Sequence, residues 1–325
     1  MPIWSFDTQK TQSIQVVLFE HFSNYCLANA VEPLRAANTL SGHPLYTWEF
    51  TTIDGGPVHS SSGLPVLPKQ ALAASSKCDY LFVMPSYGVR DHANAKTARA
   101  LQAAAKRARY VAGFDTGSWL LAAAGLLDGC RATIHWDEQT AFAETFPQVD
   151  VVADRVTDDG RFLTCGGVTT AFELVLDIIR RTQGEALHLE VSSLFVPPDE
   201  NPDRVTGATR GRHHMADRAT AIMRQNLETP LHIAQVAGAL EISQRKLEQM
   251  FQAQFGASPR TVYKRLRLLA ARRLIEGADY PIAEIALRCG YQNPAAMTRA
   301  FVREFATTPT ALRRPDAPRT RPTAR

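Results

Sequence analysis

The first 195 residues alternate short apolar runs with stretches whose apolar residues have helical spacing. The run at 79–86, DYLFVMPS, is continuously apolar, which is typical of a strand buried on both faces. Residues 150–167 indicate a hairpin that turns at Asp159-Gly160. Further strands are predicted at 14–19, 46–54 and 109–115, and helices at 29–40, 96–108, 117–127 and 168–184. This alternation predicts a three-layer, flavodoxin-like α/β domain with a mostly parallel sheet.

The last third of the chain is almost wholly helical and contains a repeat. Ile233-Ala-Gln-Val-Ala237 matches Ile282-Ala-Glu-Ile-Ala286 at an offset of 49 residues, and the offset becomes 50 after the following turn. Each copy predicts a helix, a short turn, an N-cap and a second helix, with Ser243 and Asn293 as the two caps. Residues 215–314 therefore predict an all-α domain with two helix-turn-helix units.

Two segments without apolar periodicity flank this helical domain. Residues 196–214 are rich in Pro, Gly and charge and predict a linker. Residues 315–325 are rich in Pro and Arg and predict a disordered tail. Within the domain, a long helix at 258–277 joins the two repeat copies. The expected folded domains are therefore 1–195 and 215–314.

The net charge of +4 divides unevenly between these two domains. Residues 1–203 contain 15 Lys and Arg against 23 Asp and Glu, whereas residues 204–325 contain 21 against 9. A basic domain beside an acidic one is typical of a polyanion-binding module joined to a ligand-handling module. A solvated basic face is the alternative, which charge alone does not exclude.

Composition narrows the class of protein and its compartment. Hydrophobic residues make up 45% of the chain and charged residues 21%, as in globular proteins. The sequence shows no signal-peptide pattern and no apolar run near the ~20 residues that span a bilayer, so we expect a cytoplasmic chain without membrane contact. The five cysteines are scattered without a C-x-x-C pair, so we expect neither disulfides nor a metal site, and no cofactor.

The outward positions of the second helix in each copy carry side chains that can recognise DNA. Arg and Gln form bidentate contacts with guanine and adenine edges, and Ala and Thr contact the thymine methyl group. Candidate base-reading residues are Gln244, Arg245, Glu248 and Gln249 in the first copy, and Pro294, Ala295, Thr298 and Arg299 in the second. Candidate phosphate contacts are Arg245, Lys246, Arg265 and Arg303. A helical bundle with a solvated basic surface is the alternative.

The segment AGFDTGSWLL at 112–121 predicts a strand that turns sharply into a helix at Asp115. Such an elbow directs one side chain and the first free N–H groups of the helix to the same point, beyond the carboxyl ends of the strands. At a helix N-terminus Asp115 is expected to be ionised. It caps the helix through the N–H groups of Gly117 or Ser118, or it contacts a ligand, or it does both.

The helical domain resembles the AraC/XylS family of transcriptional regulators. The resemblance rests on IAQVAGALEISQRKLEQMFQAQFGASP and IAEIALRCGYQNPAAMTRAFVREFATTP. It implies two recognition helices in successive major grooves on one face of promoter DNA, about 34 Å apart. Glu248 and Pro294 depart from this pattern, because neither is a strong base reader.

The first domain resembles the PfpI-like domains related to class I glutamine amidotransferases. The resemblance rests on AGFDTGSWLLAAAGLLDGCRATIHW and TCGGVTTAFELVLDII, and AVEPLRAAN fits the GlxA-type branch of AraC regulators. In the enzymes of that superfamily the elbow holds a cysteine nucleophile, an acidic residue after the first strand faces it, and a His follows. The resemblance places Asp115 at the elbow, Cys26 near the acidic position and His135 twenty residues after the elbow.

A fixed carboxylate is a poor nucleophile for amide chemistry but a natural partner for a cation. We therefore expect a catalytically inactive domain that binds a small cationic, nitrogen-containing effector, such as a quaternary amine or a basic amino-acid derivative. Aromatic faces attract ammonium groups and would line its site. The expected effector-binding residues are Asp115, Thr116, Trp119, His135, Trp136, Cys26 and Tyr87.

These features predict a one-component, sequence-specific transcription regulator whose partners are promoter DNA and a small-molecule effector. The family resemblance further implies a homodimer, contact with RNA polymerase, and activation rather than repression. One alternative is an active PfpI-class hydrolase or lyase with a DNA-binding appendage, in which Cys26 is a displaced nucleophile. The other is a regulator whose first domain binds a protein partner and no metabolite.

Overall fold

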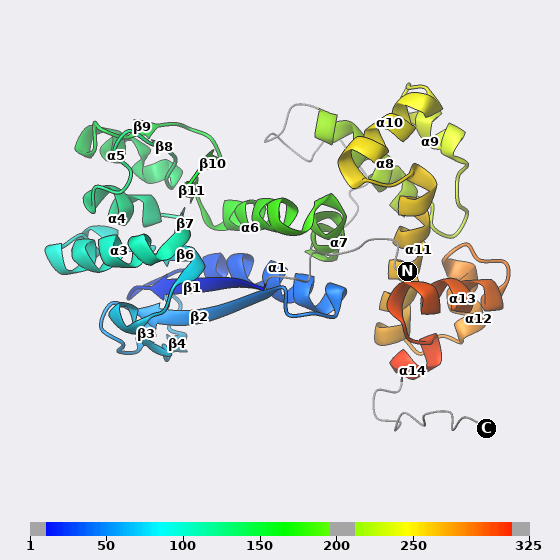
Figure 1. Cartoon of the computed structure of the whole chain (residues 1–325), viewed down its shortest axis with the longest axis horizontal. Helices are drawn as coiled ribbons and strands as arrows, with labels where there is room; N and C mark the ends of the chain where they lie inside the picture. Colours follow the sequence, from blue (N-terminus) through cyan, green and yellow to red (C-terminus); the bar gives the residue numbers. More distant parts are fainter. Residues whose placement is uncertain (1–10, 196–211, 314–325) are drawn as a thin grey trace. The chain divides into compact units, whose positions relative to one another are not determined.

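The computed structural model describes residues 11–195 and 212–313 (Figure 1). These residues form two compact units that divide after Phe195, and each unit is described by itself. Residues 196–211 of the predicted linker and the predicted tail at 315–325 lie outside the described residues. Within the described part of the chain, we find no helix with the length and apolar character needed to cross a membrane.

The N-terminal unit is built on a seven-stranded sheet with the strand order β10-β11-β7-β6-β1-β2-β5. Neighbouring strands are parallel except in the β10–β11 hairpin, so the predicted mostly parallel α/β fold is confirmed. The strands are β1 Gln12–Leu18, β2 Tyr46–Thr52, β5 Gln70–Ala71, β6 Cys78–Met84, β7 Ala108–Phe114, β10 Val156–Asp159 and β11 Phe162–Cys165. Two short pairs stand apart, β3 Val58–His59 with β4 Pro65–Val66 and β8 Arg131–Ala132 with β9 Asp150–Val151.

Helices cover both faces of this sheet and enclose a hydrophobic core on each. One face is covered by α1 Asn24–Ser41, α6 Val168–Gln183 and α7 Glu185–Phe195. The other face is covered by α2 Val89–His92, α3 Ala95–Arg107, α4 Gly117–Ala123 and α5 Gln139–Thr145. Two 3₁₀ turns, η1 Leu72–Ala74 and η2 Trp136–Glu138, complete the unit.

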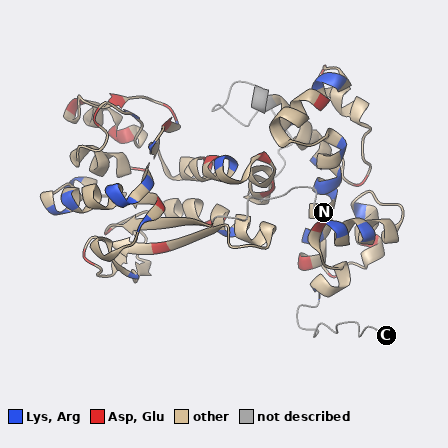
Figure 2. Cartoon of the chain, viewed as in Figure 1, with Lys and Arg blue, Asp and Glu red and all other residues tan. Residues whose placement is uncertain are grey.

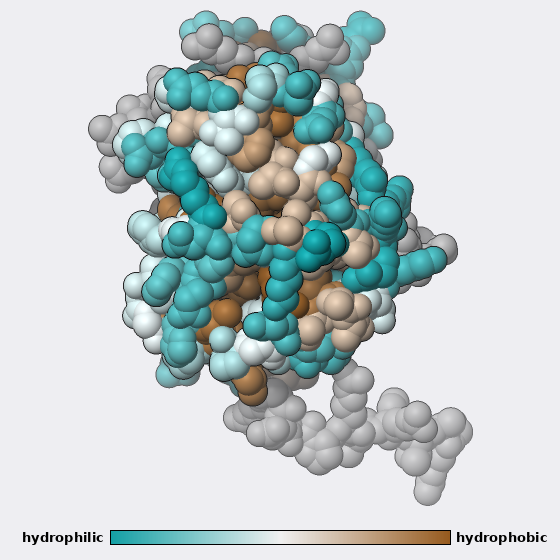
Figure 3. Space-filling model, turned by 90° about the vertical axis from the view of Figure 1, so that its left-hand side faces the viewer, coloured by the Kyte–Doolittle hydropathy of each residue, from teal (hydrophilic) through white to brown (hydrophobic). Residues whose placement is uncertain are grey.

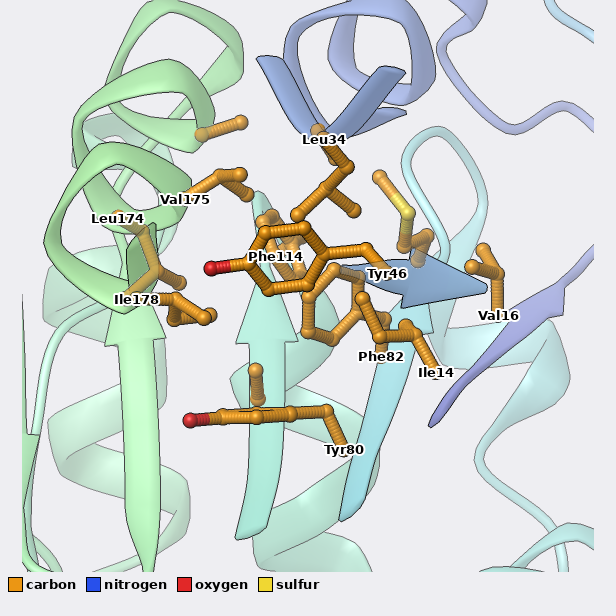
Figure 4. Close-up of a cluster of buried hydrophobic side chains, with 14 of the residues drawn as sticks. Ile14, Val16, Leu34, Tyr46, Tyr80, Phe82, Phe114, Leu174, Val175 and Ile178 are labelled. Atoms are coloured by element: carbon orange, nitrogen blue, oxygen red, sulfur yellow. The ribbon is translucent and has the colours of Figure 1, made fainter. Parts of the chain in front are cut away.

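The continuous apolar run of β6 follows from this three-layer arrangement. Tyr80 and Phe82 belong to the core under α1 and α6, where Figure 4 shows them beside α6 side chains such as Ile178. Leu81 and Val83 belong to the opposite core under α3 and α4. Because both faces of the strand are covered, its residues from 80 to 84 are all buried in one core or the other.

Helix α1 begins at Asn24 rather than at 29, after its N-cap Ser23, which sequence analysis missed. A glycine explains two further differences from the prediction. Helix α4 ends at Ala123 rather than at 127, because the chain turns at Gly125, which has a φ of +68°. Helix α7 was not predicted at all. The chain passes through Gly184 in a left-handed conformation, with a φ of +86°, and then resumes helical geometry. A helix-ending glycine therefore marks a bend here and not the end of helical structure.

The C-terminal unit is entirely helical within residues 212–313. Its helices are α8 Arg212–Gln225, α9 Ile233–Ala239, α10 Gln244–Phe255, α11 Pro259–Gly277, α12 Ile282–Arg288, α13 Pro294–Phe305 and α14 Pro309–Arg313. The pairs α9–α10 and α12–α13 are the two predicted helix-turn-helix units, so this half of the fold prediction is also confirmed. Helix α8 begins inside the segment predicted as a linker.

Both predicted N-caps are present in the C-terminal unit. Ser243 Oγ accepts a hydrogen bond from the N–H of Lys246 at 3.2 Å, and Asn293 Oδ1 accepts one from the N–H of Ala295 at 2.8 Å. The apolar residues at i, i+4 and i+8 pack α10 and α13 into the unit; Leu247, Phe251, Phe255, Met297 and Phe301 are buried, and Phe305 is half-buried. The opposite face of each helix is thereby left to solvent.

Candidate functional site

The predicted elbow lies at the carboxyl end of β7, in the middle of the sheet. Strand β7 ends at Phe114, α4 begins at Gly117, and Asp115 between them has a φ of +58°. A non-glycine residue in the left-handed region is strained, and such strain is held in place where the surrounding structure requires it. The geometry is that of a nucleophile elbow with a carboxylate in the nucleophile position.

Two glycines allow the elbow to be this sharp. A Cβ on Gly117 would lie 2.4 Å from the carbonyl oxygen of Val83 in β6. A Cβ on Gly113 would lie 3.0 Å from the backbone nitrogen of Ser118. The start of α4 therefore packs directly against the backbone of the sheet, which fixes the direction of the Asp115 side chain.

The Asp115 carboxylate is buried, with 3% of the residue exposed. Its Oδ2 accepts a hydrogen bond from Ser86 Oγ at 2.8 Å, and its backbone oxygen accepts one from the N–H of His135 at 3.1 Å. Burial raises the pKa of Asp115 above its ordinary value of 3.8, and the Ser86 hydrogen bond and nearby His135 oppose this rise. The expectation that the helix N-terminus keeps this carboxylate ionised left out desolvation, which acts against the ionised form.

Thr116 and Asp115 hold the same neighbouring segment. Thr116 Oγ1 donates a hydrogen bond to the backbone oxygen of Ser86 at 2.9 Å, while Ser86 Oγ donates to Asp115. Thr116 is the N-cap residue of α4 but forms no side-chain cap bond. Among the hydrogen bonds of the described residues, the Asp115 carboxylate also accepts none from Gly117 or Ser118. The side chains of the elbow thus tie the turn after β6 in place and leave the helix uncapped.

Two buried thiols lie close to Asp115. Burial raises the pKa of Cys26 well above its ordinary value of 9.0, and the charges of Cys165 and Asp115 act in the same direction. Burial also raises the pKa of Cys165 to about 12, which hydrogen bonds from the backbone of Asp115 and Gly167 partly oppose. The thiolate is the reactive form of cysteine, so burial disfavours the reactive form of both residues. Sequence analysis missed Cys165, although the TCGG motif contains it.

Trp119 does not line a ligand site, and its prediction as an aromatic wall was wrong. Only 6% of the residue is exposed, and its ring packs against Phe142 and Phe146. The guanidinium of Arg90 lies 4.3 Å from the ring centroid and pairs with Glu138 at 2.7 Å. Trp119 therefore already holds a cation of the protein itself.

The other two predicted aromatic residues lie at the surface. Tyr87 is 66% exposed and Trp136 is 74% exposed. Each follows directly after a residue that is hydrogen-bonded to Asp115, since Ser86 and His135 precede them. Tyr25, which sequence analysis missed, is also exposed and precedes Cys26. The exposed aromatic residues are thus sequence neighbours of residues close to Asp115. On the side of the molecule drawn in Figure 3, most side chains are hydrophilic, with apolar groups between them.

The described residues contain no group of three or more His, Cys, Asp or Glu that could hold a metal ion. All five cysteines are free thiols. A cavity of about 220 Å³ lies between the β10–β11 hairpin and α6, where Asp158, Asp177, Arg180 and Arg181 line it. It does not include Asp115 and is a separate feature of the unit.

In the C-terminal unit, the candidate DNA-contacting residues are almost all accessible. The exposed ones are Gln244, Arg245, Lys246, Glu248, Gln249, Ala295, Arg299 and Arg303. Thr298 is half-buried, and its hydroxyl donates to the backbone oxygen of Pro294 at 3.0 Å. Gln244 Nε2 donates to Glu248 Oε1 at 2.9 Å, so two of the four candidate base-reading side chains of α10 bond to each other. Figure 2 shows Lys and Arg residues on α10, α11 and α13.

Arg265 is the exception, and its prediction as a phosphate contact was wrong. The residue is buried on α11 and forms an ion pair with Glu304, which is buried at the end of α13. A guanidinium inside the domain cannot reach a phosphate. The positive charge counted at this position in the sequence is therefore neutralised within the fold.

Comparison with known proteins gives matches for both units. Residues 12–181 match the DJ-1/PfpI family, and residues 236–315 match a helix-turn-helix domain. The chain is 33% identical to the HTH-type transcriptional regulator CdhR of Pseudomonas aeruginosa, over 92% of this chain and 90% of the relative. It is also 33% identical to the HTH-type transcriptional regulator GlxA of Rhizobium meliloti, over 95% of this chain and 98% of the relative.

The N-terminal unit has more than one kind of relative. A solved structure of an AraC family transcriptional regulator from Pseudomonas putida has a TM-score of 0.51 and 26% identity, and the match covers 57% of this chain and 100% of that one. An isonitrile hydratase of Pseudomonas putida is 32% identical over 47% of this chain and 69% of its own length. The N-terminal fold is thus shared by proteins named as regulators and by a protein named as an enzyme.

Proposed function

This chain belongs to the DJ-1/PfpI family and to the HTH-type transcriptional regulators, and from that premise we propose that its N-terminal unit binds a small cationic effector at Asp115 and thereby controls DNA binding by the C-terminal unit. The supporting observation is a buried carboxylate with which no Lys or Arg of the described residues forms an ion pair. Burial of an unpaired charge is costly, so a cationic ligand would be stabilised beside it. The exposed rings of Tyr87 and Trp136 offer faces that attract ammonium groups.

The proposed DNA contacts are made by α10 and α13. Arg245, Gln249 and Arg299 would read base edges, and Lys246 and Arg303 would contact phosphates. Their exposure on the faces opposite the apolar seats supports this assignment. The resemblance to AraC/XylS regulators supports a homodimer that activates transcription with RNA polymerase in the cytoplasm. Effector binding must favour one arrangement of the DNA-binding units over another, because a ligand without such preference regulates nothing.

We also propose that the N-terminal unit does not catalyse a reaction, although an isonitrile hydratase is among its relatives. The elbow holds a carboxylate where the related enzymes hold a thiol, and burial raises the pKa of both nearby thiols. Iodoacetamide is therefore expected to leave Cys26 and Cys165 unmodified in the native protein and to modify them after unfolding. Rapid alkylation of native Cys26 would instead support the enzyme alternative.

Thermal shift measurements test the effector proposal. The full chain is heated with quaternary amines, basic amino acids and neutral or acidic controls, and the same series is run on Asp115→Asn. A cationic compound is expected to raise the melting temperature of the wild type and not that of Asp115→Asn. Asp128→Asn is the matched control, because Asp128 is an exposed aspartate in the loop after α4 and should respond as the wild type does.

Two results would contradict this proposal. If neutral or acidic compounds stabilise the wild type, or if Asp115→Asn responds equally to the amine, Asp115 is not the counter-ion of the effector. If no compound shifts the wild type, the alternative in which this unit binds a protein partner is favoured.

A further inference from the structure

The two helix-turn-helix copies differ at one position of their turns. In the first copy Glu241 has a φ of +56°, and in the second copy Gly290 has a φ of +72°. The two residues are equivalent, because the residue after each donates its N–H to the carbonyl of an alanine five positions before itself. These bonds measure 3.1 Å in the first copy and 2.8 Å in the second. Glu241 shows that a side chain is tolerated in this left-handed turn. The backbone conformation alone therefore does not explain the glycine at 290.

The glycine is explained by contact with the first copy. A Cβ on Gly290 would lie 2.5 Å from the carbonyl oxygen of Leu227 and 2.5 Å from Cγ of Pro230. Both residues belong to the loop at 226–232, which connects α8 to α9 and leads into the first helix-turn-helix unit. The turn of the second unit thus lies directly against the backbone of the first, and any side chain at this position would separate them.

Helix α11 binds the loop of the first unit through Tyr263. The Tyr263 hydroxyl donates a hydrogen bond to the backbone oxygen of Asn226 at 2.6 Å and accepts one from the N–H of Leu231 at 3.3 Å. These two bonds hold the ends of the loop that Gly290 contacts.

One helical turn further along, α11 binds the turn of the second unit through Arg267. Its Nε donates to the backbone oxygen of Cys289 at 2.8 Å, and its Nη2 donates to that of Gly290 at 2.7 Å. Its guanidinium also lies 4.1 Å from the ring centroid of Tyr291. Residues four apart share one face of a helix, so Tyr263 and Arg267 hold the loop and the turn together from the same side.

We propose that this contact is a positioning device that fixes the distance between recognition helices α10 and α13, with Gly290, Tyr263 and Arg267 as its positioning residues. The consequence is that one protomer accepts DNA segments of a single spacing. An inserted base pair moves the second segment by about 3.4 Å and rotates it by about 35° around the duplex axis, and a rigid pair of helices cannot follow this change. The inference rests on the proposed contact of α10 and α13 with DNA.

The test uses the full chain and DNA that it selects from a random-sequence pool. Footprints of Arg245→Ala and Arg299→Ala identify the segment that each recognition helix contacts, since each variant should lose protection of one segment. Binding is then measured to duplexes with one base pair removed, or one or two inserted, between these segments. Wild type is expected to lose at least about tenfold in affinity for each changed spacing.

Gly290→Ala is expected to flatten this spacing profile or to move its optimum. Gly256→Ala is the matched control, because Gly256 also has a left-handed backbone, with a φ of +60°, but an added Cβ there meets nothing within 4 Å. The control should lose some stability and keep the spacing profile of the wild type. The profile is the decisive measurement, because a merely structural role would lower all affinities equally.

Tyr263→Phe provides a second variant if Gly290→Ala does not fold, as judged by circular dichroism. This substitution removes the hydroxyl that holds the loop and leaves the side-chain volume almost unchanged. The affinities of the variant for the original and the changed spacings should differ by less than tenfold. If the folded variants keep the wild-type profile, the positioning inference is wrong. If the wild type protects no pair of segments, the proposed DNA contact is wrong, and the inference falls with it.

Discussion

Each unit buries a carboxylate, and the two carboxylates are treated differently. Glu304 in the C-terminal unit forms an ion pair with Arg265, and both side chains are almost fully buried. Asp115 in the N-terminal unit is equally buried but meets only the hydroxyl of Ser86 through its carboxylate. The charge of a buried carboxylate that pairs with a guanidinium is neutralised inside the fold. A buried carboxylate that accepts a hydrogen bond only from a hydroxyl keeps a negative charge that a cationic ligand can neutralise. The same feature is therefore structural in one unit and a candidate binding feature in the other.

The largest effect on stability is expected when the cation of the buried ion pair, Arg265, is removed. Arg265→Met removes the guanidinium that pairs with buried Glu304, which should lower the free energy of unfolding of the C-terminal unit by about 3–5 kcal/mol. Trp48, Trp119 and Trp136 lie in the described part of the N-terminal unit, and residues 212–313 contain no Trp, so their fluorescence follows the N-terminal unit during urea unfolding. The loss should consequently be seen in helical circular dichroism at urea concentrations where the fluorescence is unchanged.

The double variant Arg265→Met with Glu304→Leu is the control for this prediction. It removes both charges and fills the space with apolar groups, so it should regain most of the lost stability. If Arg265→Met alone unfolds within about 1 kcal/mol of the wild type, the pair is not a structural requirement of the unit.

A smaller effect of opposite sign, a gain in stability at neutral pH, is expected when Asp115 is replaced by Asn. The pKa of Asp115 is raised in the folded chain, so the folded state binds the proton more tightly than the unfolded state does. The stabilisation of the folded state by this proton is fully present below pH 3.8 and is lost as the pH rises through the pKa of the folded state. Asp115→Asn cannot ionise and avoids that loss. Its melting temperature, followed by Trp fluorescence, should therefore exceed that of the wild type at neutral pH, and the difference should disappear below pH 3.8.

An unchanged difference between the two proteins across this pH range would show that ionisation of Asp115 does not affect stability. Asp128→Asn, at an exposed position, should show no pH-dependent difference from the wild type.

The smallest effect on stability is expected at Arg303, which precedes Glu304 but is exposed. Arg303→Ala should change the free energy of unfolding by no more than about 0.5 kcal/mol. If Arg303 contacts a phosphate, the slope of log affinity against log salt should fall in magnitude by about 0.9. An unchanged slope would remove Arg303 from the proposed DNA interface and leave the neighbouring ion pair unaffected.

The C-terminal unit was the more predictable of the two. Its helices, caps and apolar seats follow from contacts between residues close in sequence, so periodicity and capping residues were enough to find them. Arg265 shows where this reasoning fails. Its partner Glu304 lies 39 positions away, and a count of charges cannot tell a buried arginine from an exposed one.

The elbow site was predictable only in part. The strand-turn-helix pattern placed Asp115 correctly, because glycines at 113 and 117 are visible in the sequence. Its partner Ser86, the covering of Trp119 by Arg90 and the nearby Cys165 depend on segments that only the sheet brings together. The raised pKa of Asp115 likewise depends on burial, which no local pattern reports.

The sequence by itself determined the alternation of strands and helices, the repeat, the division of charge and the families that the chain resembles, because each depends on composition or on neighbouring residues. Only the tertiary structure decided which charges are neutralised and which glycine is required by contact with another part of the backbone. Glu241 and Gly290 occupy the same turn of the repeat, yet only the second lies against another backbone. Proximity between distant segments is what distinguishes them, and it arises only when the helices pack.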